Sequence, residues 1–296
     1  MTRHVTLVHN PGARGDTAAH LERALKVTRE AGWSADVVTT DVAGHGFLLA
    51  GEAAARGSDL VAAVGGDGTV REVAAGLAGT AVPLVIVPAG TGNSSYLELF
   101  GETPWDENLA AVMAHPGTRL VDMIELQPTG ELGLLGFSAG WFAQIIQLAA
   151  GAGAVGAAAY ASAAGVAAAA PVQFPGSVRV DGKLLTSGDF GLVAVGGARV
   201  RASVFPVFPA SRLDDGLLEV LVVRATDTSG FNELLGAVLE GRHLDHPLTS
   251  YAQATEVELS APEGMLAEFD GDIWERDAHS LQLRCAPAQL TVALVG

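Results

Sequence analysis

The chain has 296 residues, of which 49% are hydrophobic and 17% charged, so it can bury the cores of two domains and is not a disordered chain. Its 33 acidic and 17 basic residues give a net charge of −16, which argues against a nucleic-acid partner and against electrostatic attachment to an anionic membrane. The single cysteine, Cys285, cannot form an internal disulfide, and no charged-then-apolar signal segment precedes Val5. We therefore expect a cytoplasmic protein, and leave open a peripheral contact at the inner face of the membrane.

The first 118 residues alternate between short β-branched runs and helical patterns. Strands are expected at residues 4–10, 35–40, 60–64 and 84–87. Helices are expected at about 16–31, 70–79, 94–100 and 105–114, and a further helix follows the second strand and ends at residue 56. Strands that alternate with helices in this way favour a parallel sheet with helices on both faces. The sequence therefore predicts an N-terminal α/β domain with a parallel, doubly wound sheet over residues 1–118.

Two glycine-rich loops follow neighbouring strands of this predicted sheet. The first is Gly65-Gly66-Asp67-Gly68-Thr69, and the second is Pro88-Ala89-Gly90-Thr91-Gly92-Asn93. Glycines without Cβ let backbone N–H groups approach a polyanion, and the N-terminus of a following helix adds a partial positive charge. Both loops are therefore predicted to bind phosphate groups at the carboxyl ends of the strands.

From Arg119 onward the pattern changes to alternating strands with hairpin signals. Tight turns are expected at Thr129-Gly130, Asp181-Gly182, Asp215-Gly216 and Asp270-Gly271. A helix is expected at about 228–241 and strands at 250–261, 264–270, 279–285 and 288–295. We therefore predict a mainly antiparallel β-sandwich over residues 119–296, and leave open that its last strand returns to the first domain.

Residues 132–178 contain no charged side chain, which raises the question of a membrane span at 143–170. Alanine and glycine dominate this stretch, and they are only weakly hydrophobic, so a pair of short packed helices is the favoured interpretation. Peripheral membrane contact would then depend on Trp141, Phe142, Ile145 and Ile146 if they face outward; an inward, core-packing orientation is the favoured alternative.

The two glycine loops together resemble the diacylglycerol kinase catalytic-domain family, which includes sphingosine kinases and bacterial lipid kinases. Asn10-Pro11-Gly12 with Arg14 resembles the family's N-terminal nucleotide loop. The resemblance implies ATP and Mg²⁺ as cofactors and a lipid hydroxyl as the phosphoryl acceptor. The residues that it assigns to nucleotide binding are Asn10, Pro11, Gly12, Arg14, Thr40, Gly65, Gly66, Asp67, Gly68, Thr69, Gly90, Thr91, Gly92 and Asn93.

Two further segments resemble the family in the second domain. The loop that ends in Leu213-Asp214-Asp215-Gly216 resembles one that holds a structural Mg²⁺ in relatives, with Asp215 and the Leu217 carbonyl as ligands here, although an ordinary turn satisfies the same residues. The segment 268–272 resembles the family's D-G-E segment, whose acids are proposed to activate the substrate hydroxyl. It makes Asp270 and Asp272 the candidate catalytic residues; Asp67 is expected to serve nucleotide and Mg²⁺, with catalytic base as a lesser option.

Three alternatives remain at this point. The chain could phosphorylate a soluble alcohol, as NAD kinases do, or it could bind nucleotide without catalysis. Gly136-Phe137-Ser138-Ala139-Gly140 also fits the nucleophile elbow of a hydrolase, with Asp245-His246 or Asp277 and His279 as partners. The lipid, the nucleotide preference and a possible homodimer are left open by the sequence.

Overall fold

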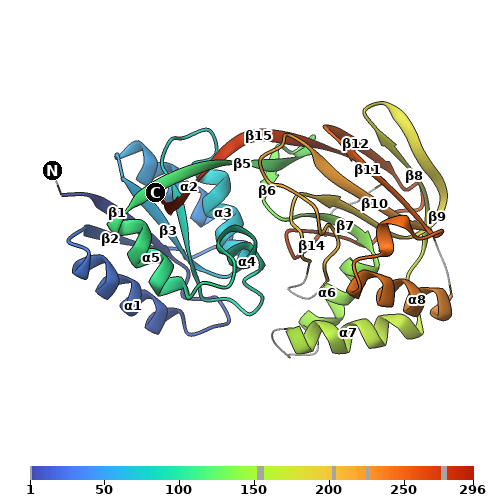
Figure 1. The fold of residues 1–296 in the computed structure, drawn as a ribbon, viewed down its shortest axis with the longest axis horizontal. Coiled ribbons are helices and arrows are strands. Elements are labelled where there is room, and N and C mark those ends of the chain that lie inside the picture. Colours follow the sequence, from blue (N-terminus) through green and yellow to red (C-terminus); the bar gives the residue numbers. More distant parts are fainter. Residues whose placement is uncertain (1, 152–156, 202–204, 225–226, 275–278) are drawn as a thin grey trace. The chain divides into compact units, whose positions relative to one another are not determined.

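The computed structural model describes residues 2–151, 157–201, 205–224, 227–274 and 279–296 (Figure 1). The chain divides into two compact units. One comprises Met1–Asp122 with Ala288–Gly296, and the other comprises Met123–Pro287. The first is a parallel α/β unit and the second is an antiparallel β unit, which confirms the predicted fold class.

The first unit is a parallel sheet in the strand order β2-β1-β3-β4 with helices on both faces. The strands are β1 (His4–His9), β2 (Ser34–Thr39), β3 (Leu60–Gly65) and β4 (Leu84–Pro88), and the helices are α1 (Thr17–Glu30), α2 (His45–Ala55), α3 (Asp67–Leu77), α4 (Ser94–Phe100) and α5 (Trp105–Ala114). Helices α1 and α5 pack together on one face, and α2 and α3 on the other (Figure 1). Because both faces are covered, all of β3 is buried, as is typical of parallel sheets.

Helices α2 and α3 cross unusually closely. A Cβ on Gly76 of α3 would overlap the Phe47 carbonyl oxygen of α2. Glu72 of α3 accepts hydrogen bonds from the N–H groups of Gly44 (2.7 Å) and Gly46 (2.9 Å), which start α2. The carboxylate therefore caps α2 from the neighbouring helix and compensates for the absence of a side-chain cap at Gly44.

The second unit is built from antiparallel strands, and its α-helices share a core with two of these strands. Its strands are β5 (Pro116–Gln127), β6 (Glu131–Gly133), β7 (Gly136–Gly140), β8 (Phe174–Val180), β9 (Lys183–Gly196), β10 (Leu218–Arg224), β11 (Thr249–Ala254), β12 (Glu256–Ser260), β13 (Ala267–Phe269), β14 (Asp272–Trp274) and β15 (Ser280–Val295). Its helices are α6 (Trp141–Gly151), α7 (Ala157–Ala169), α8 (Thr228–Leu239) and the short 3-10 helix η1 (His243–Asp245). The long strands β5 and β15 also contribute residues to the first unit.

Side-chain alternation in β9 and β10 separates two cores in this unit. Val193, Val195 and Val220 join one core with residues of β7, β12 and β13. Leu192 and Leu221 join the other core, which α6, α7 and α8 cover. Each of these strands is therefore buried on both faces, and the helices fix the far side of the sheet.

The hairpin predictions are confirmed at three of the four sites. Thr129-Gly130, Asp181-Gly182 and Asp270-Gly271 connect the antiparallel pairs β5/β6, β8/β9 and β13/β14. The prediction for Asp215-Gly216 is wrong, because this turn only leads into β10, which pairs with β9 and β11.

The structure also corrects the strands predicted between residues 250 and 295. The expected strand 250–261 is divided into β11 and β12, because Thr255 and Glu256 turn to donate their N–H groups to the Asp181 carboxylate (3.0 Å each). The expected strands 279–285 and 288–295 form one strand, β15, in which Ala288 has a φ of +53° and donates its N–H group to Asp122 (2.8 Å). The strand predicted at 264–270 is shorter, at Ala267–Phe269.

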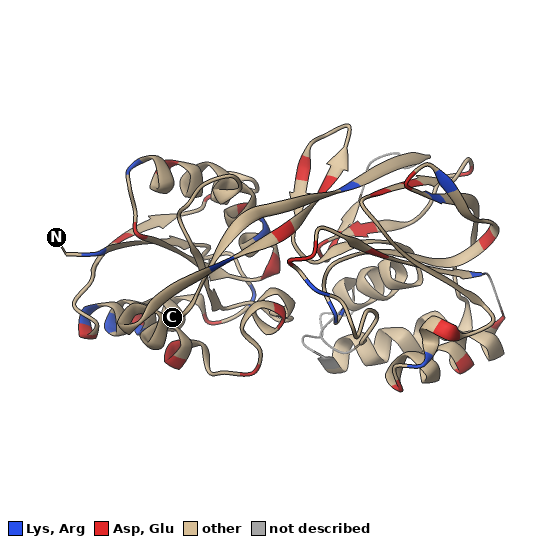
Figure 2. Ribbon diagram, turned by 45° about the horizontal axis from the view of Figure 1, so that its top comes forward, with Lys and Arg blue, Asp and Glu red and all other residues tan. Residues whose placement is uncertain are grey.

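The uncharged stretch forms the helix pair α6 and α7, as predicted, and both helices are drawn without a charged residue in Figure 2. In the part of the chain that the structure describes, no helix has the length and hydropathy that a membrane crossing requires. Trp141, Phe142 and Ile145 are buried in the helix-covered core. These are three of the four side chains named for membrane contact; the fourth, Ile146, is half-buried, and the contact stays a prediction.

Candidate functional site

Three loops of the first unit lie at one edge of the parallel sheet. The register pairs His9 of β1 with Val64 of β3, and Val64 with Val87 of β4. Because parallel strands end at the same edge, the loops that begin at Asn10, Gly65 and Ala89 are neighbours. This edge is where ligands bind in open α/β sheets.

Asn10 connects the first loop to the second. Its side-chain Nδ2 donates to Thr69 Oγ1 (2.9 Å), and its Oδ1 accepts from the N–H group of Gly12 (2.9 Å). Thr69 is buried and also lies against Gly65, where a Cβ would overlap its side chain. The Asn-Pro-Gly turn and the first glycine loop are therefore held in one fixed arrangement.

Asp67 connects the first glycine loop to the second. Its two carboxylate oxygens accept hydrogen bonds from the N–H groups of Ser94 (3.1 Å) and Ser95 (2.8 Å), in the first turn of α4. The carboxylate thus caps α4 from outside, and the positive end of that helix offsets its charge. Tyr96 secures the same helix by donating its hydroxyl hydrogen to the Thr103 carbonyl (2.6 Å), and burial raises the pKa of Tyr96 to about 12.

The two glycine loops also touch through their backbones. A Cβ on Gly90 would lie 2.5 Å from Gly66 Cα, and a Cβ on Gly66 would lie 3.3 Å from Gly90 Cα. Asn93, with a φ of +53°, closes the second loop by accepting from the Gly90 N–H (2.9 Å) and donating to the Gly90 carbonyl (3.1 Å). The close approach requires glycine at 90; at 66 a Cβ would make a tight contact, and the φ of −90° is open to other residues.

The N-terminus of α3 makes this edge of the sheet suitable for binding anions. The first N–H groups of an α-helix have no acceptor inside the helix, and Gly66 supplies no side-chain cap. Anions bind at such helix ends, and phosphate oxygens can accept several N–H groups at once. The glycine cradle and the helix end therefore fit the phosphates of a nucleotide, the ligand that the three loops were predicted to hold.

The other predicted nucleotide residues lie around the same edge. Pro11, Gly12 and Arg14 are exposed in the first loop, and Gly68, Thr91 and Gly92 are half-buried in the glycine loops. Thr40 is buried just after β2, and its N–H group donates to the His9 carbonyl (2.9 Å). Their contact with a nucleotide stays a prediction.

The two candidate catalytic acids of the second unit differ in environment. Asp270 is 2% exposed, and its carboxylate accepts N–H groups from Leu134 (2.6 Å), Leu135 (2.9 Å) and Gly136 (2.8 Å). Asp272 is exposed at the start of β14. Because its two buried oxygens are occupied by three N–H groups, the structure favours an anchoring role for Asp270 and leaves Asp272 as the more accessible acid.

The predicted structural metal site lies in an exposed turn. Asp215 Oδ1 accepts the N–H group of Leu217 (3.0 Å), and Arg212 donates to Asp214 (3.0 Å). Among the described residues no three His, Cys, Asp or Glu side chains gather as metal ligands. Magnesium in phosphoryl-transfer sites takes one or two carboxylates together with phosphate oxygens, so such a cluster is not required for a nucleotide-borne ion.

The hydrolase interpretation is not supported. Ser138 lies in the middle of β7, is fully buried and donates its hydroxyl hydrogen to Glu268, whereas a nucleophile elbow is an exposed turn after a strand. His246 contacts Glu233, and His279 contacts the Pro262 carbonyl; Asp277 lies outside the described residues.

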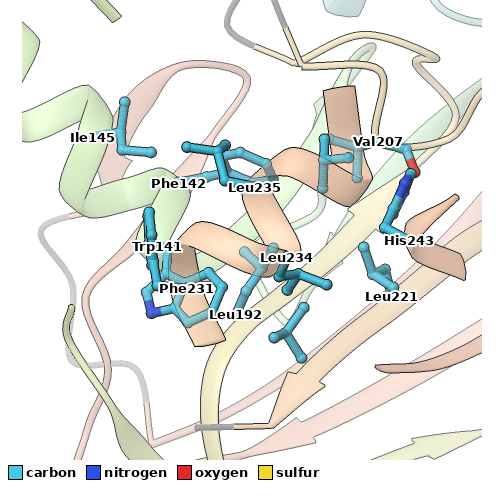
Figure 3. A pocket seen from close by; sticks show the side chains of 12 residues that line it. Trp141, Phe142, Ile145, Leu192, Val207, Leu221, Phe231, Leu234, Leu235 and His243 are labelled. Atoms are coloured by element: carbon cyan, nitrogen blue, oxygen red, sulfur yellow. The ribbon is translucent and has the colours of Figure 1, made fainter. Parts of the chain in front are cut away.

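An apolar pocket lies between α6, α8 and the strands β9 and β10 (Figure 3). It is lined by Trp141, Phe142, Ile145, Leu192, Val207, Leu221, Val223, Phe231, Leu234, Leu235, Val238 and His243. Aliphatic and aromatic side chains form its walls, with His243 and Ile145 at opposite ends of the view in Figure 3. The cavity measures about 20 Å³, enough for about one water molecule.

Sequence reasoning missed two features of these sites. The hydrogen bonds between Asp67 and α4 join residues 27 and 28 positions apart, and no local sequence pattern predicts them. The buried ion pair of Arg201 and Glu268 was also missed. The sequence signal for this pair was Glu268, a charged residue between the apolar Ala267 and Phe269.

Both halves of the chain match known families. Residues 4–126 match the diacylglycerol kinase catalytic domain, and residues 137–294 match the YegS C-terminal NAD kinase beta sandwich-like domain. These two matches cover the units that carry the three loops and the two acids.

The similarity to individual proteins extends over nearly the whole chain. A probable lipid kinase YegS-like of Pseudomonas fluorescens is 30% identical, with 92% of this chain and 89% of that protein covered. A diacylglycerol kinase of Bacillus subtilis is 25% identical, with coverages of 91% and 90%. The crystal structure of a putative diacylglycerol kinase from Bacillus anthracis has the same fold, with a TM-score of 0.78 at 21% identity over 99% of this chain and 97% of that one.

Proposed function

Because the chain belongs to the bacterial lipid kinase family, with a diacylglycerol kinase catalytic domain followed by a YegS C-terminal domain, we propose that it transfers the γ-phosphoryl group of ATP to a lipid hydroxyl. The observation that carries the proposal is the linked set of three loops at the sheet edge. Asn10 and Asp67 hold these loops together, and Gly66 and Gly90 keep side chains out of the space between them.

Each part of the chain then has a defined task. The α3 N-terminus and the glycine loops bind the nucleotide phosphates through backbone N–H groups. Bound Mg²⁺ would neutralise charge that develops on the transferred group. Asp272 accepts the proton of the acceptor hydroxyl, since a free alcohol is a poor nucleophile near neutral pH, and Asp270 holds the turn on which Asp272 lies.

The apolar pocket supports a lipid over a soluble acceptor. Its lining offers hydrocarbon and aromatic contacts, which favour an acyl chain and offer a soluble alcohol little hydrogen bonding. Its volume is too small for a chain as it stands, so we propose that α6 and α8 side chains move apart when the lipid enters.

The acceptor is tested with γ-labelled ATP and Mg²⁺ in parallel reactions that contain a bacterial lipid extract, NAD or no acceptor. The proposal predicts label in an organic-extractable product only with the lipid extract. Label in NAD would favour the soluble-alcohol alternative, and nucleotide binding without transfer in any reaction would favour a protein that has lost catalysis.

The pocket is tested separately by fluorescence quenching with lipids that carry brominated acyl chains. Trp141 lines the pocket, so its emission should be quenched, and the Trp141→Phe variant should lose that part of the quenching. Equal quenching in both proteins would place the acyl chain elsewhere.

A further inference from the structure

A buried charged cluster contacts the turn that carries the two acids. Glu268 is fully buried, Ser138 is fully buried and Arg201 is 7% exposed. Ser138 faces Glu268 across the β7/β13 ladder, and both Ser138 Oγ and Arg201 Nη2 donate to Glu268 Oε1. The other carboxylate oxygen, Oε2, accepts the N–H group of Gly271 at 2.8 Å.

Both the cluster and Asp270 are also hydrogen-bonded to Gly136, at the start of β7. The Gly136 carbonyl accepts from Arg201 Nη2 (3.2 Å) and from the Asp270 N–H (2.9 Å), while the Gly136 N–H donates to Asp270 Oδ1 (2.8 Å). The turn between β13 and β14 is thus bound on both sides, by Glu268 at Gly271 and by Gly136 at Asp270.

Stability alone does not account for this cluster. Removing two charges from water costs several kcal/mol per ion, and apolar side chains of similar volume are often as stabilising as a buried ion pair. Within the described residues, the Arg201 Nη1 atom is buried without a hydrogen-bond partner, which adds to that cost. An arrangement that costs this much fits a role in fixing a conformation.

We propose that the Arg201–Glu268 ion pair, with Ser138, is a positioning element that holds Gly271 and thereby sets the place of Asp272; the proposal rests on the kinase function proposed above. Asp270 and Gly271 have φ values of +52° and +92°, the turn that Asp-Gly favours, so the local sequence forms the turn and the cluster fixes where it lies. A displacement of about 1 Å at a reacting group can cost about 10²-fold in rate.

The test replaces the pair by apolar side chains in the double variant Arg201→Met/Glu268→Leu. This change restores packing without a buried charge but leaves the Gly271 N–H and the Ser138 hydroxyl without their acceptor. We expect an unfolding free energy near that of the wild type, a KM for ATP within about twofold, and a kcat at least about tenfold lower. A wild-type kcat in the folded double variant would show that the cluster is only structural.

Amide hydrogen exchange at Gly271 supplies a readout that does not depend on activity. Exchange should be faster in the double variant and unchanged in Glu219→Gln, a control at a buried carboxylate that accepts from Tyr251 and Gln253 instead. Unchanged exchange at Gly271 would overturn the positioning role, whatever the activity. If exchange at Gly271 is faster in the double variant but the wild type phosphorylates no lipid, the proposed function is contradicted and the positioning role remains supported.

If the double variant does not unfold cooperatively, Glu268→Gln decides the question, because it keeps the side-chain shape and removes the charge opposite Arg201. A lower kcat with unchanged KM for ATP and faster Gly271 exchange supports the proposal. A wild-type kcat with wild-type exchange overturns it.

Discussion

Asp67 brings a negative charge into a loop that we propose binds phosphates, and its hydrogen bonds explain why the charge is tolerated. Both oxygens are used by the N–H groups of Ser94 and Ser95, so the charge is directed at the α4 N-terminus. Asp67→Ala should therefore lower the unfolding free energy by about 0.5–2 kcal/mol, as for a lost helix cap, and raise the KM for ATP.

A matched control for that prediction is Asp227→Ala, which removes the cap that Asp227 gives α8 by accepting from Gly230 (3.0 Å). Urea unfolding should show a similar loss for both variants, whereas only Asp67→Ala should change the KM. An equal rise of the KM in both would mean that general destabilisation, and not the loop contact, is responsible.

The two acids of the 270–272 turn should respond differently to amide replacement. Asp272→Asn should lower turnover by about 10²–10⁴-fold with little change in stability, as for a lost general base. Asp270→Asn should also reduce stability, because one amide oxygen cannot replace two oxygens that accept three N–H groups.

Asp181→Asn is the control, because Asp181 also precedes a glycine with a positive φ, and a single oxygen, Oδ1, accepts from Thr255 and Glu256. It should retain wild-type turnover. Full activity in Asp272→Asn would move the base to another residue, with Asp67 the next candidate.

At the scale of elements, the close α2/α3 crossing predicts different effects of alanine substitution at two helical glycines, Gly76 and Gly51. A Cβ on Gly76 would come within 3.0 Å of the Phe47 backbone, whereas a Cβ on Gly51 would lie 3.6 Å from the Gly76 carbonyl, an ordinary contact. Gly76→Ala should therefore cost about 1–3 kcal/mol through overpacking, and Gly51→Ala should be neutral or gain up to about 1 kcal/mol of helix propensity. Chemical denaturation measures both, and equal effects would contradict the close crossing.

The short helix η1 places His243 among the apolar side chains of the pocket, and its Nε2 donates to the Val207 carbonyl (2.7 Å). Burial lowers the pKa of His243 from its ordinary value of 6.5. The unfolded chain therefore binds more protons below pH 6.5, so this contribution to stability is present above pH 6.5 and is lost as the pH falls through the folded-state pKa.

The check is the unfolding free energy of wild type and His243→Gln between pH 5 and 8. The difference between the two proteins should shrink on acidification. A difference that is constant across this range would mean that His243 does not become protonated on unfolding.

Local patterns predicted the elements of the first unit well, and contacts between distant segments explain most of what they missed. The glycine loops were visible because an apolar run, glycines and a helix start follow one another in the sequence. The continuity of β15 was not, because it depends on a left-handed Ala288 that donates to the distant Asp122. The different environments of Asp270 and Asp272 likewise depend on residues 134–136, which lie far away in the sequence.

At the scale of the whole chain, the proposed tasks are divided between the two compact units. The loops that fit phosphates belong to the first unit, and the acids with the apolar pocket belong to the second. The family matches divide the chain similarly, with one match per unit over most of its length. Both units are therefore needed for the proposed reaction.

The most direct test of the account measures phosphoryl transfer from γ-labelled ATP to an organic-extractable lipid product in wild type and in Gly90→Ala. A Cβ on Gly90 would lie 2.5 Å from Gly66 Cα, so this substitution should force apart the loops that we propose hold the phosphates. We expect labelled lipid from the wild type and at least about a tenfold loss in a Gly90→Ala protein that still unfolds cooperatively. Absence of labelled lipid from the wild type, or an equal rate in the folded variant, would contradict it.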